Sequence, residues 1–166
     1  MEEVLARLQL DGVDAVDLAV NVSVLAIALL FSMPVAWDRE KSTRAMGLRT
    51  FPLVAVASAA FVLVGRAVIG DGDPDAHARV IQGLVAGIGF IGGGAILKKG
   101  DRVLGAATAA AIWATAGIGL AVAHGLYAVA GVLSLLSFAV LRLLRPVKEA
   151  MNGNDQWADG VSDEEE

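Results

Sequence analysis

The sequence contains no cysteine, which excludes disulfide bonds, thiolate-bound metals and cysteine nucleophiles. Charged residues are also scarce, at 19% of the 166 residues, whereas a soluble domain usually carries about 25%. The charges that are present gather into short clusters, and residues 80–97 contain no ionisable side chain. Hydrophobic residues make up 56% of the chain. Because an uncharged apolar stretch of this length is long enough to cross a bilayer, the sequence indicates a membrane protein.

Five apolar stretches reach the length of about 17–25 residues that a transmembrane helix needs. The predicted fold class is therefore an all-α membrane protein, a bundle of about five transmembrane helices covering residues 18–37, 51–69, 80–97, 104–123 and 126–144. We expect an N-terminal extracytoplasmic segment at 1–17, a transmembrane domain at 18–145, and a cytoplasmic tail at 146–166. The tail ends in four acidic residues, a pattern typical of a solvated, disordered end.

Lysine and arginine are distributed unequally between the two ends of these predicted spans. If the chain crosses five times, ten of them lie at one end and three at the other. Cytoplasmic loops of membrane proteins carry an excess of these residues, so the N-terminus is predicted outside and the C-terminus in the cytoplasm. The ten are Arg39, Lys41, Arg44, Arg49, Lys98, Lys99, Arg102, Arg142, Arg145 and Lys148, and the three are Arg7, Arg66 and Arg79.

Glycine is concentrated in the third predicted span, although each glycine costs a helix about 1 kcal/mol relative to alanine. In membranes, small residues allow helix backbones to approach closely. The glycines of this span fall on two roughly opposite stripes, Gly83, Gly87 and Gly94 on one and Gly89, Gly92 and Gly93 on the other. We therefore expect a central helix with neighbours on both sides and a kink or break at residues 92–94.

Two further packing predictions follow from the small residues. Gly117 and Gly119 of the fourth span are expected to lie in helix contacts. The spacing Gly83-x-x-x-Gly87 is typical of close helix dimers in membranes, so we expect a homodimer.

Residues 87–92 read GIGFIG and match the dinucleotide-binding pattern G-x-G-x-x-G. That pattern functions only between a strand and a helix N-terminus, with an acidic residue about 20 positions further on. Here the flanking sequence is a membrane helix, and the region 20 residues downstream reads ATAAAIW. The glycines are therefore interpreted as packing residues, and no nucleotide or other cofactor is predicted.

Acidic residues are absent from the interior of every predicted span. A transporter of a divalent cation needs oxygen ligands along its path, and Asp38 lies only at the end of the first span. We interpret it as an interfacial acid that pairs with a nearby arginine, and we predict no metal site. Arg66 and Arg142 are interpreted as snorkelling residues, and His124 as a solvated loop residue. The deeper polar candidates are Gln82, Thr108 and Thr115.

Several blocks of the chain together resemble the MgtC/SapB family of bacterial inner-membrane proteins. They are GLRT at 47–50, Arg79, GIGFIGGG at 87–94, TAAAIW at 108–113 and AGIG at 116–119. The resemblance covers the transmembrane region and implies a multi-pass protein of the bacterial inner membrane, linked to growth under magnesium limitation and to survival inside host cells. It adds candidate functional residues, which are Asp38, Arg49, Thr50, Arg79, Thr108 and Trp113.

The chain departs from the family pattern in three places. SMPVAW at 32–37 replaces a glycine-rich segment before the acidic residue at 38, and GAAT at 105–108 replaces Gly-Leu-Thr-Thr. We also expect the cytoplasmic C-terminal domain of many members to be lacking.

Two functional hypotheses remain open at this point. The first is adaptation to low magnesium or stress through regulation of membrane partners, with the lipid bilayer and a membrane protein as the expected contacts. The second is a transporter or channel for Mg²⁺ or another small solute. No catalytic constellation is recognisable, so no enzymatic activity is expected, and no nucleic-acid partner is predicted.

Overall fold

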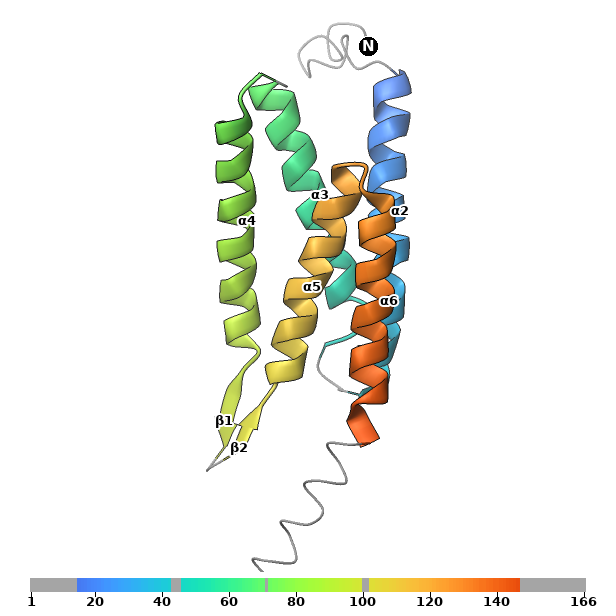
Figure 1. The fold of residues 1–166 in the computed structure, drawn as a ribbon, viewed down its shortest axis with the longest axis vertical. Helices are drawn as coiled ribbons and strands as arrows, with labels where there is room; N and C mark the ends of the chain where they lie inside the picture. The colour runs from blue at the N-terminus through green and yellow to red at the C-terminus, as the bar shows by residue number, and fades with distance from the viewer. Residues whose placement is uncertain (1–14, 43–45, 71, 100–101, 147–166) are drawn as a thin grey trace, which may run out of the picture.

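A computed structural model describes residues 15–42, 46–70, 72–99 and 102–146 of the chain. Within them, five helices run alternately up and down, and a two-stranded hairpin projects at one end (Figure 1). We call this the hairpin end and the opposite one the turn end. The elements are α2 (Ala15–Ser42), α3 (Thr50–Ile69), α4 (Pro74–Gly94), β1 (Leu97–Lys99), β2 (Arg102–Leu104), α5 (Ala106–Ala123) and α6 (Tyr127–Leu143).

Helix α4 begins and ends at residues suited to helix boundaries. Pro74 occupies the start, and the side chain of Asp73 accepts a hydrogen bond of 2.9 Å from the amide of Ala76, which caps the helix. The helix stops at Gly94, where the amides of Ala95 and Ile96 bond the carbonyls of Gly92 and Gly93 at 3.1 Å each. The glycine triplet thus ends the helix, in agreement with the expected break of the predicted span at residues 92–94.

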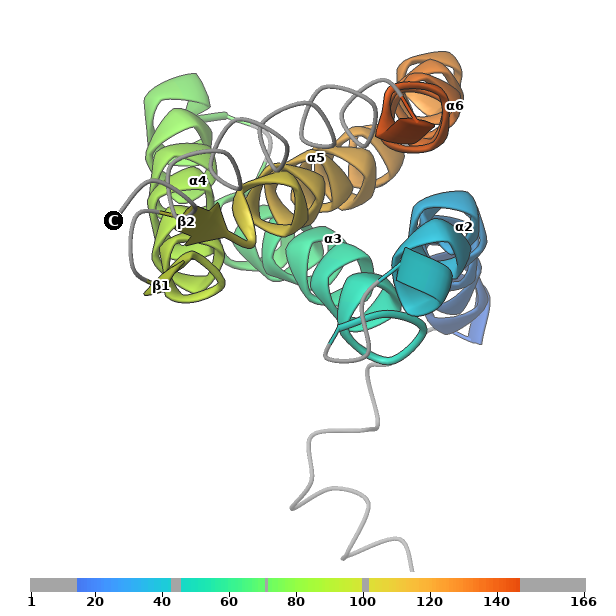
Figure 2. The same cartoon turned by 90° about the horizontal axis from the view of Figure 1, so that it is seen from below.

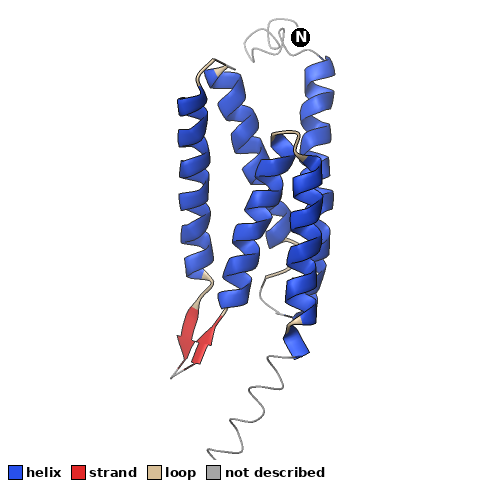
Figure 3. Ribbon diagram, in the orientation of Figure 1, coloured by secondary structure: helices blue, strands red, loops and turns tan. Residues whose placement is uncertain are grey.

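The connection from α4 to α5 is a β-hairpin rather than the continued helix and short turn implied by the predicted spans (Figure 3). Leu97 pairs with Leu104 and Lys98 with Val103 in an antiparallel register. The third predicted span ended at residue 97 and the fourth began at residue 104. Both limits were wrong, because these residues lie in strands. Gly105 then turns the chain into α5 with a φ of 86°, a left-handed conformation that glycine adopts without strain.

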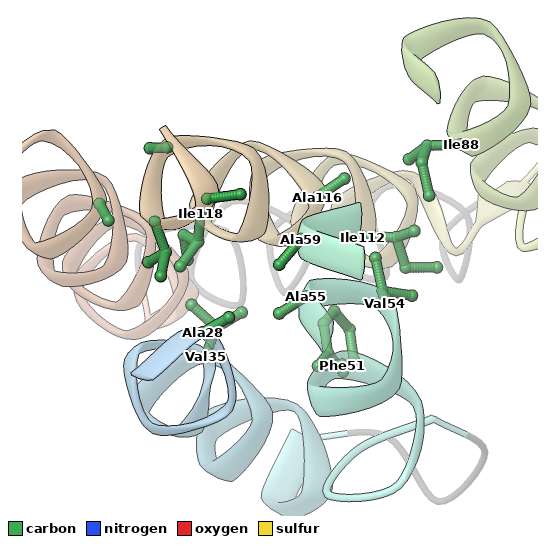
Figure 4. Close-up of a cluster of buried hydrophobic side chains, with 14 of the residues drawn as sticks. Ala28, Val35, Phe51, Val54, Ala55, Ala59, Ile88, Ile112, Ala116 and Ile118 are labelled. Carbon is green, nitrogen blue, oxygen red and sulfur yellow. The ribbon is translucent and has the colours of Figure 1, made fainter. Parts of the chain in front are cut away.

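The centre of the bundle is formed by α3 and α5, with α4 at one edge (Figure 2). Helix α5 packs against all four other helices and buries ten of its 18 residues, whereas α4 buries only Ile88 and Gly92. The prediction that the third span is the central helix is therefore wrong for the single chain. The core lies between α2, α3 and α5, where Val35, Phe51 and Ile112 are fully buried (Figure 4).

The outer surface of the bundle is apolar. Phe61, Phe90 and Leu135 are more than half exposed, and a soluble protein would have to cover a surface of this kind. Three helices, α2, α3 and α5, are long and apolar enough to cross a membrane, and α6 is a shorter apolar helix. The protein is therefore an all-α membrane bundle.

The predicted packing glycines fall into two groups. A methyl group on Gly92, Gly117 or Gly119 would contact a neighbouring element, most closely at Gly119, where it would lie 2.9 Å from the carbonyl carbon of Ala55 in α3. At the other predicted packing glycines, a methyl group would meet no atom of another described element within 4 Å, and these are Gly83, Gly87, Gly89, Gly93 and Gly94. Any close packing at these five positions must involve another molecule.

Candidate functional site

The hairpin end of α2 holds a buried ion pair. Asp38 and Arg39 are only 3% and 5% exposed, and the guanidinium donates to one carboxylate oxygen from Nη2 at 2.6 Å and from Nε at 3.2 Å. Ser42 donates from its hydroxyl to the carbonyl of Asp38 at 2.6 Å. Buried charges are tolerated when paired and hydrogen-bonded, so these contacts explain why both residues can lie inside the bundle.

The start of α3 is held against the same part of α2. The carboxylate of Glu40 accepts a 2.8 Å hydrogen bond from the amide of Leu48. Gly47 lies so close that a methyl group there would come within 2.7 Å of the Cα of Glu40. The carbonyl of Gly47 accepts hydrogen bonds from the amides of Thr50 and Phe51, which begins the helix. Glycine is needed at this position because the two backbones touch.

Arg145, just past the end of α6, reaches the same region. Its Nη1 lies 3.4 Å from the hydroxyl of Ser42. We call Asp38, Arg39, Ser42 and Arg145 the Asp38 cluster. It joins the hairpin ends of α2 and α6 and lies beside the beginning of α3.

The other candidate residues do not converge on this cluster. Arg49 is exposed, and the arginine that pairs with Asp38 is the adjacent Arg39. Thr50 is half-buried in the first turn of α3. Thr108 is buried in the first turn of α5, and Arg79 is exposed near the start of α4, at the turn end.

Trp113, a candidate functional residue from the family resemblance, has a side chain that is 57% exposed. It borders a shallow apolar groove of about 170 Å³ over α5, between α4 and α6. Leu84 and Ile88 of α4 and Leu133 of α6 line the same groove. The indole therefore lies at the lipid-facing surface of α5.

Buried hydroxyl groups act mainly as helix contacts. Ser134 of α6 donates to the carbonyl of Phe31 in α2 at 2.6 Å, and Thr115 donates to Ala111 within its own helix at 2.8 Å. Gln82 is exposed on α4. Over residues 15–42, 46–70, 72–99 and 102–146, no three His, Asp or Glu side chains gather in a way that could hold a metal ion.

A second polar site lies at the turn end, and the sequence analysis missed it. Arg66 of α3 donates from Nη1 to the carbonyl of Ala123 at 2.7 Å, and its Nη2 lies 3.2 Å from Nδ1 of His124. The interpretation of His124 as a solvated loop residue is wrong, because its Nε2 is buried. Arg66 is exposed near the end of α3, and the interpretation as a snorkelling residue did not include its contacts with Ala123 and His124. One signal was available, because Arg66 lies a full turn inside the predicted span, where a charge needs a partner.

The pKa of His124 is lowered from its usual value near 6.5. Burial of the imidazole contributes most, followed by the positive charge of Arg66 and then by His77. His77, in α4, is itself fixed by a 2.8 Å contact between its Nε2 and the carbonyl of Gly70. The site thus favours a neutral imidazole at His124.

A large apolar groove of about 590 Å³ runs between α3 and α4. Gly83 and Gly87 of α4 contribute to its lining, together with Phe61 and Val68 of α3. The open glycines of α4 therefore border a groove on the lipid-facing surface.

Comparison with known proteins gives consistent matches. The sequence model of the MgtC family matches residues 25–150. The chain is 40% identical over 134 residues to Protein MgtC of Brucella abortus, a match that covers 81% of this chain and 55% of that protein. It is 34% identical over 128 residues to Protein MgtC of Salmonella typhimurium, covering 77% of this chain and 54% of that protein.

A third relative carries a different name. The chain is 39% identical over 114 residues to Protein SrpB of Synechococcus elongatus, covering 62% of this chain and 63% of that protein. The chain spans a little over half the length of the curated MgtC proteins that it matches. No solved structure matches it.

Proposed function

The chain belongs to the MgtC family, and from this we propose that it is a multi-pass protein of the bacterial inner membrane that supports adaptation to low magnesium or stress by regulating membrane partners. We favour regulation over transport because of the pairing of Asp38 with Arg39. Among the described residues it is the only buried carboxylate, and Arg39 already neutralises it. Mg²⁺ binds through several oxygen ligands, which this arrangement does not offer.

Transport of Mg²⁺ or another small solute is the alternative, and a flux measurement separates the two. The full chain is reconstituted into proteoliposomes, and Mg²⁺ entry is followed with an internal indicator. We expect no uptake above that of empty liposomes. Saturable uptake that is lost in Asp38→Asn and retained in Asp17→Asn, a matched change at an exposed position of α2, would reverse the assignment.

The proposed orientation places the hairpin end in the cytoplasm and the turn end outside. Lys98 and Arg145 lie at the hairpin end, in agreement with the excess of basic residues in cytoplasmic loops. Reporter fusions inside the β1–β2 hairpin should report the cytoplasm, and fusions at Asp73 the outside. A periplasmic signal from the hairpin would contradict this topology.

We further propose a homodimer formed through α4. Five glycines of this helix have open space beside them in the described part of the chain, and Gly83 and Gly87 border the α3–α4 groove. Small residues on an exposed helix surface allow a second helix to approach closely in lipid.

Gly87→Leu is expected to abolish the dimer and to leave the monomer folded, because no other described element lies within 4 Å of the position where the new side chain begins. Native mass spectrometry from mild detergent measures the assembly, and thermal unfolding followed by circular dichroism measures the fold. Ala128→Leu, at an exposed position of α6, is the matched control and should remain dimeric. A wild-type protein that is monomeric under these conditions would contradict the proposal.

The identity of the membrane partner is best approached through co-purification. The native protein is extracted with its associated proteins, and those that stay bound are identified by mass spectrometry. A membrane partner recovered with the wild type, and absent with an unrelated multi-pass protein, would support regulation.

A further inference from the structure

The side chain of Arg66 in α3 contacts the turn between α5 and α6. The carbonyl of Ala123 belongs to the last residue of α5, and terminal carbonyls of a helix lack partners within the helix. Arg66 supplies a donor to it at 2.7 Å. A positive charge also interacts favourably with the C-terminal end of the helix dipole. The arginine therefore caps α5 from a neighbouring helix.

The second contact of Arg66 depends on the protonation of His124. A guanidinium has only donors, so the Nδ1 of His124 that faces it at 3.2 Å must accept, and the proton of the neutral ring is then on Nε2. Protonation of Nδ1 would place two donors and two positive charges against each other. The Nε2 atom is buried and has no hydrogen-bond partner among the described residues. A charged ring would thus lose its hydrogen bond with Arg66.

We propose that Arg66 and His124 form a pH-sensitive latch, which holds the α5–α6 turn against α3 when His124 is neutral and releases it when His124 is protonated. The turn lies set back from the α3–α4 connection and from the start of α2 (Figure 1). The proposed orientation would place the latch at the outer side of the membrane. The latch goes beyond the proposed function and does not depend on it.

The direction of the pH response follows from the charges around the imidazole. Burial, Arg66 of α3 and His77 of α4 all lower the pKa of His124 in the latched state. The described residues at this end include other ionisable groups, but none of them is a cause of the lowered pKa of His124. These groups are Asp17 of α2, Tyr127 of α6, and Asp73, Asp75 and Arg79 of α4. The latched state therefore binds fewer protons than the released state. The latched state therefore has its full stability, relative to the released state, at pH values above the ordinary histidine pKa near 6.5. This stability decreases as the pH falls below that value.

Titration of the His124 imidazole by NMR tests the charge state on which the latch depends. The chain has only two histidines, His77 and His124, so the ring signals of the full protein in nanodiscs can be assigned with a His77→Gln variant. We expect the pKa of His124 to lie below its ordinary value, and to rise in Arg66→Gln, which keeps a donor but removes the charge. A wild-type pKa at or above the ordinary value would overturn the latch by itself.

A distance measurement tests the release. Because the chain has no cysteine, spin labels at Val68→Cys and Val129→Cys are the only labelled sites, and both positions are exposed. We expect the distance distribution to lengthen or broaden between pH 8 and pH 5. His124→Gln stays neutral and can still accept from Arg66, so its distribution should remain that of the wild type at pH 8. An unchanged wild-type distribution at pH 5, or a full pH response in His124→Gln, would disprove the latch.

Discussion

Gly119→Ala is expected to destabilise the bundle by about 3 kcal/mol or more, a large effect for the addition of one methyl group. Overpacking of a core usually costs about 1–3 kcal/mol because side chains can shift. Here the methyl group would overlap the backbone carbonyl of Ala55, and its carbon would lie 2.9 Å away. A backbone carbonyl inside α3 cannot move without displacing the helix. The expected result is therefore separation of α3 from α5, the two helices at the centre of the bundle.

Gly117→Ala is the matched control for this experiment. It introduces the same methyl group into the same helix two residues earlier, but its nearest neighbour is the terminal carbon of Leu133 at 3.1 Å. A leucine side chain can rotate away, so we expect a loss below about 1 kcal/mol. Unfolding of both variants in detergent, followed by circular dichroism, gives the comparison. Equal stability of the two variants would show that α3 and α5 do not cross at Ala55 and Gly119.

Asp38→Ala is expected to cost about 3–5 kcal/mol, because it removes the carboxylate that compensates the buried charge of Arg39. Arg39 is 5% exposed, and its Nε and Nη2 atoms donate to the same carboxylate oxygen of Asp38. The free energy of unfolding in detergent measures the effect. Asp17→Ala, at an exposed acid of the same helix, should change it by less than about 0.5 kcal/mol.

The double variant Asp38→Leu/Arg39→Met distinguishes the loss of the pair from the loss of one charge. Replacement of a complete buried pair by apolar residues of similar volume is often neutral. The double variant should therefore be more stable than Asp38→Ala, and a double-mutant cycle measures the coupling between the two positions. Additive losses would mean that the two residues do not act as a pair.

The helices could be predicted from the sequence because the apolar stretches are uninterrupted and long. The position of α4 in the bundle could not. A helix with small residues on two faces has the same sequence pattern whether the helices packed against it come from one chain or from two. In the structure, no other described element lies within 4 Å of a Cβ placed on Gly83 or Gly87. Gly117 and Gly119 look alike in the sequence. Gly119 tolerates a side chain far less than Gly117 because it packs against the backbone of Ala55 in α3.

The polar sites were predictable to different degrees. Pairing of Asp38 with an arginine was expected, because three arginines lie close to it in sequence. The contact between Arg66 and His124 joins residues 58 positions apart. No periodicity or local motif relates two such positions. The charge inside the predicted span was the only clue, and it indicates that a partner exists without identifying it.

The unequal lengths of the helices have a consequence for the surrounding lipid. Helix α2 has 28 residues and α5 has 18, which correspond to about 42 Å and about 27 Å at a rise of about 1.5 Å per residue. The hydrocarbon core is about 30 Å thick, and lipids around a shorter helix adjust by thinning. Lipid head groups and water should therefore lie closer to the bilayer centre beside the turn between α5 and α6. The bilayer around this protein is expected to be thin on one flank and thick on the other, so that neighbouring proteins would be sorted by the length of their own spans.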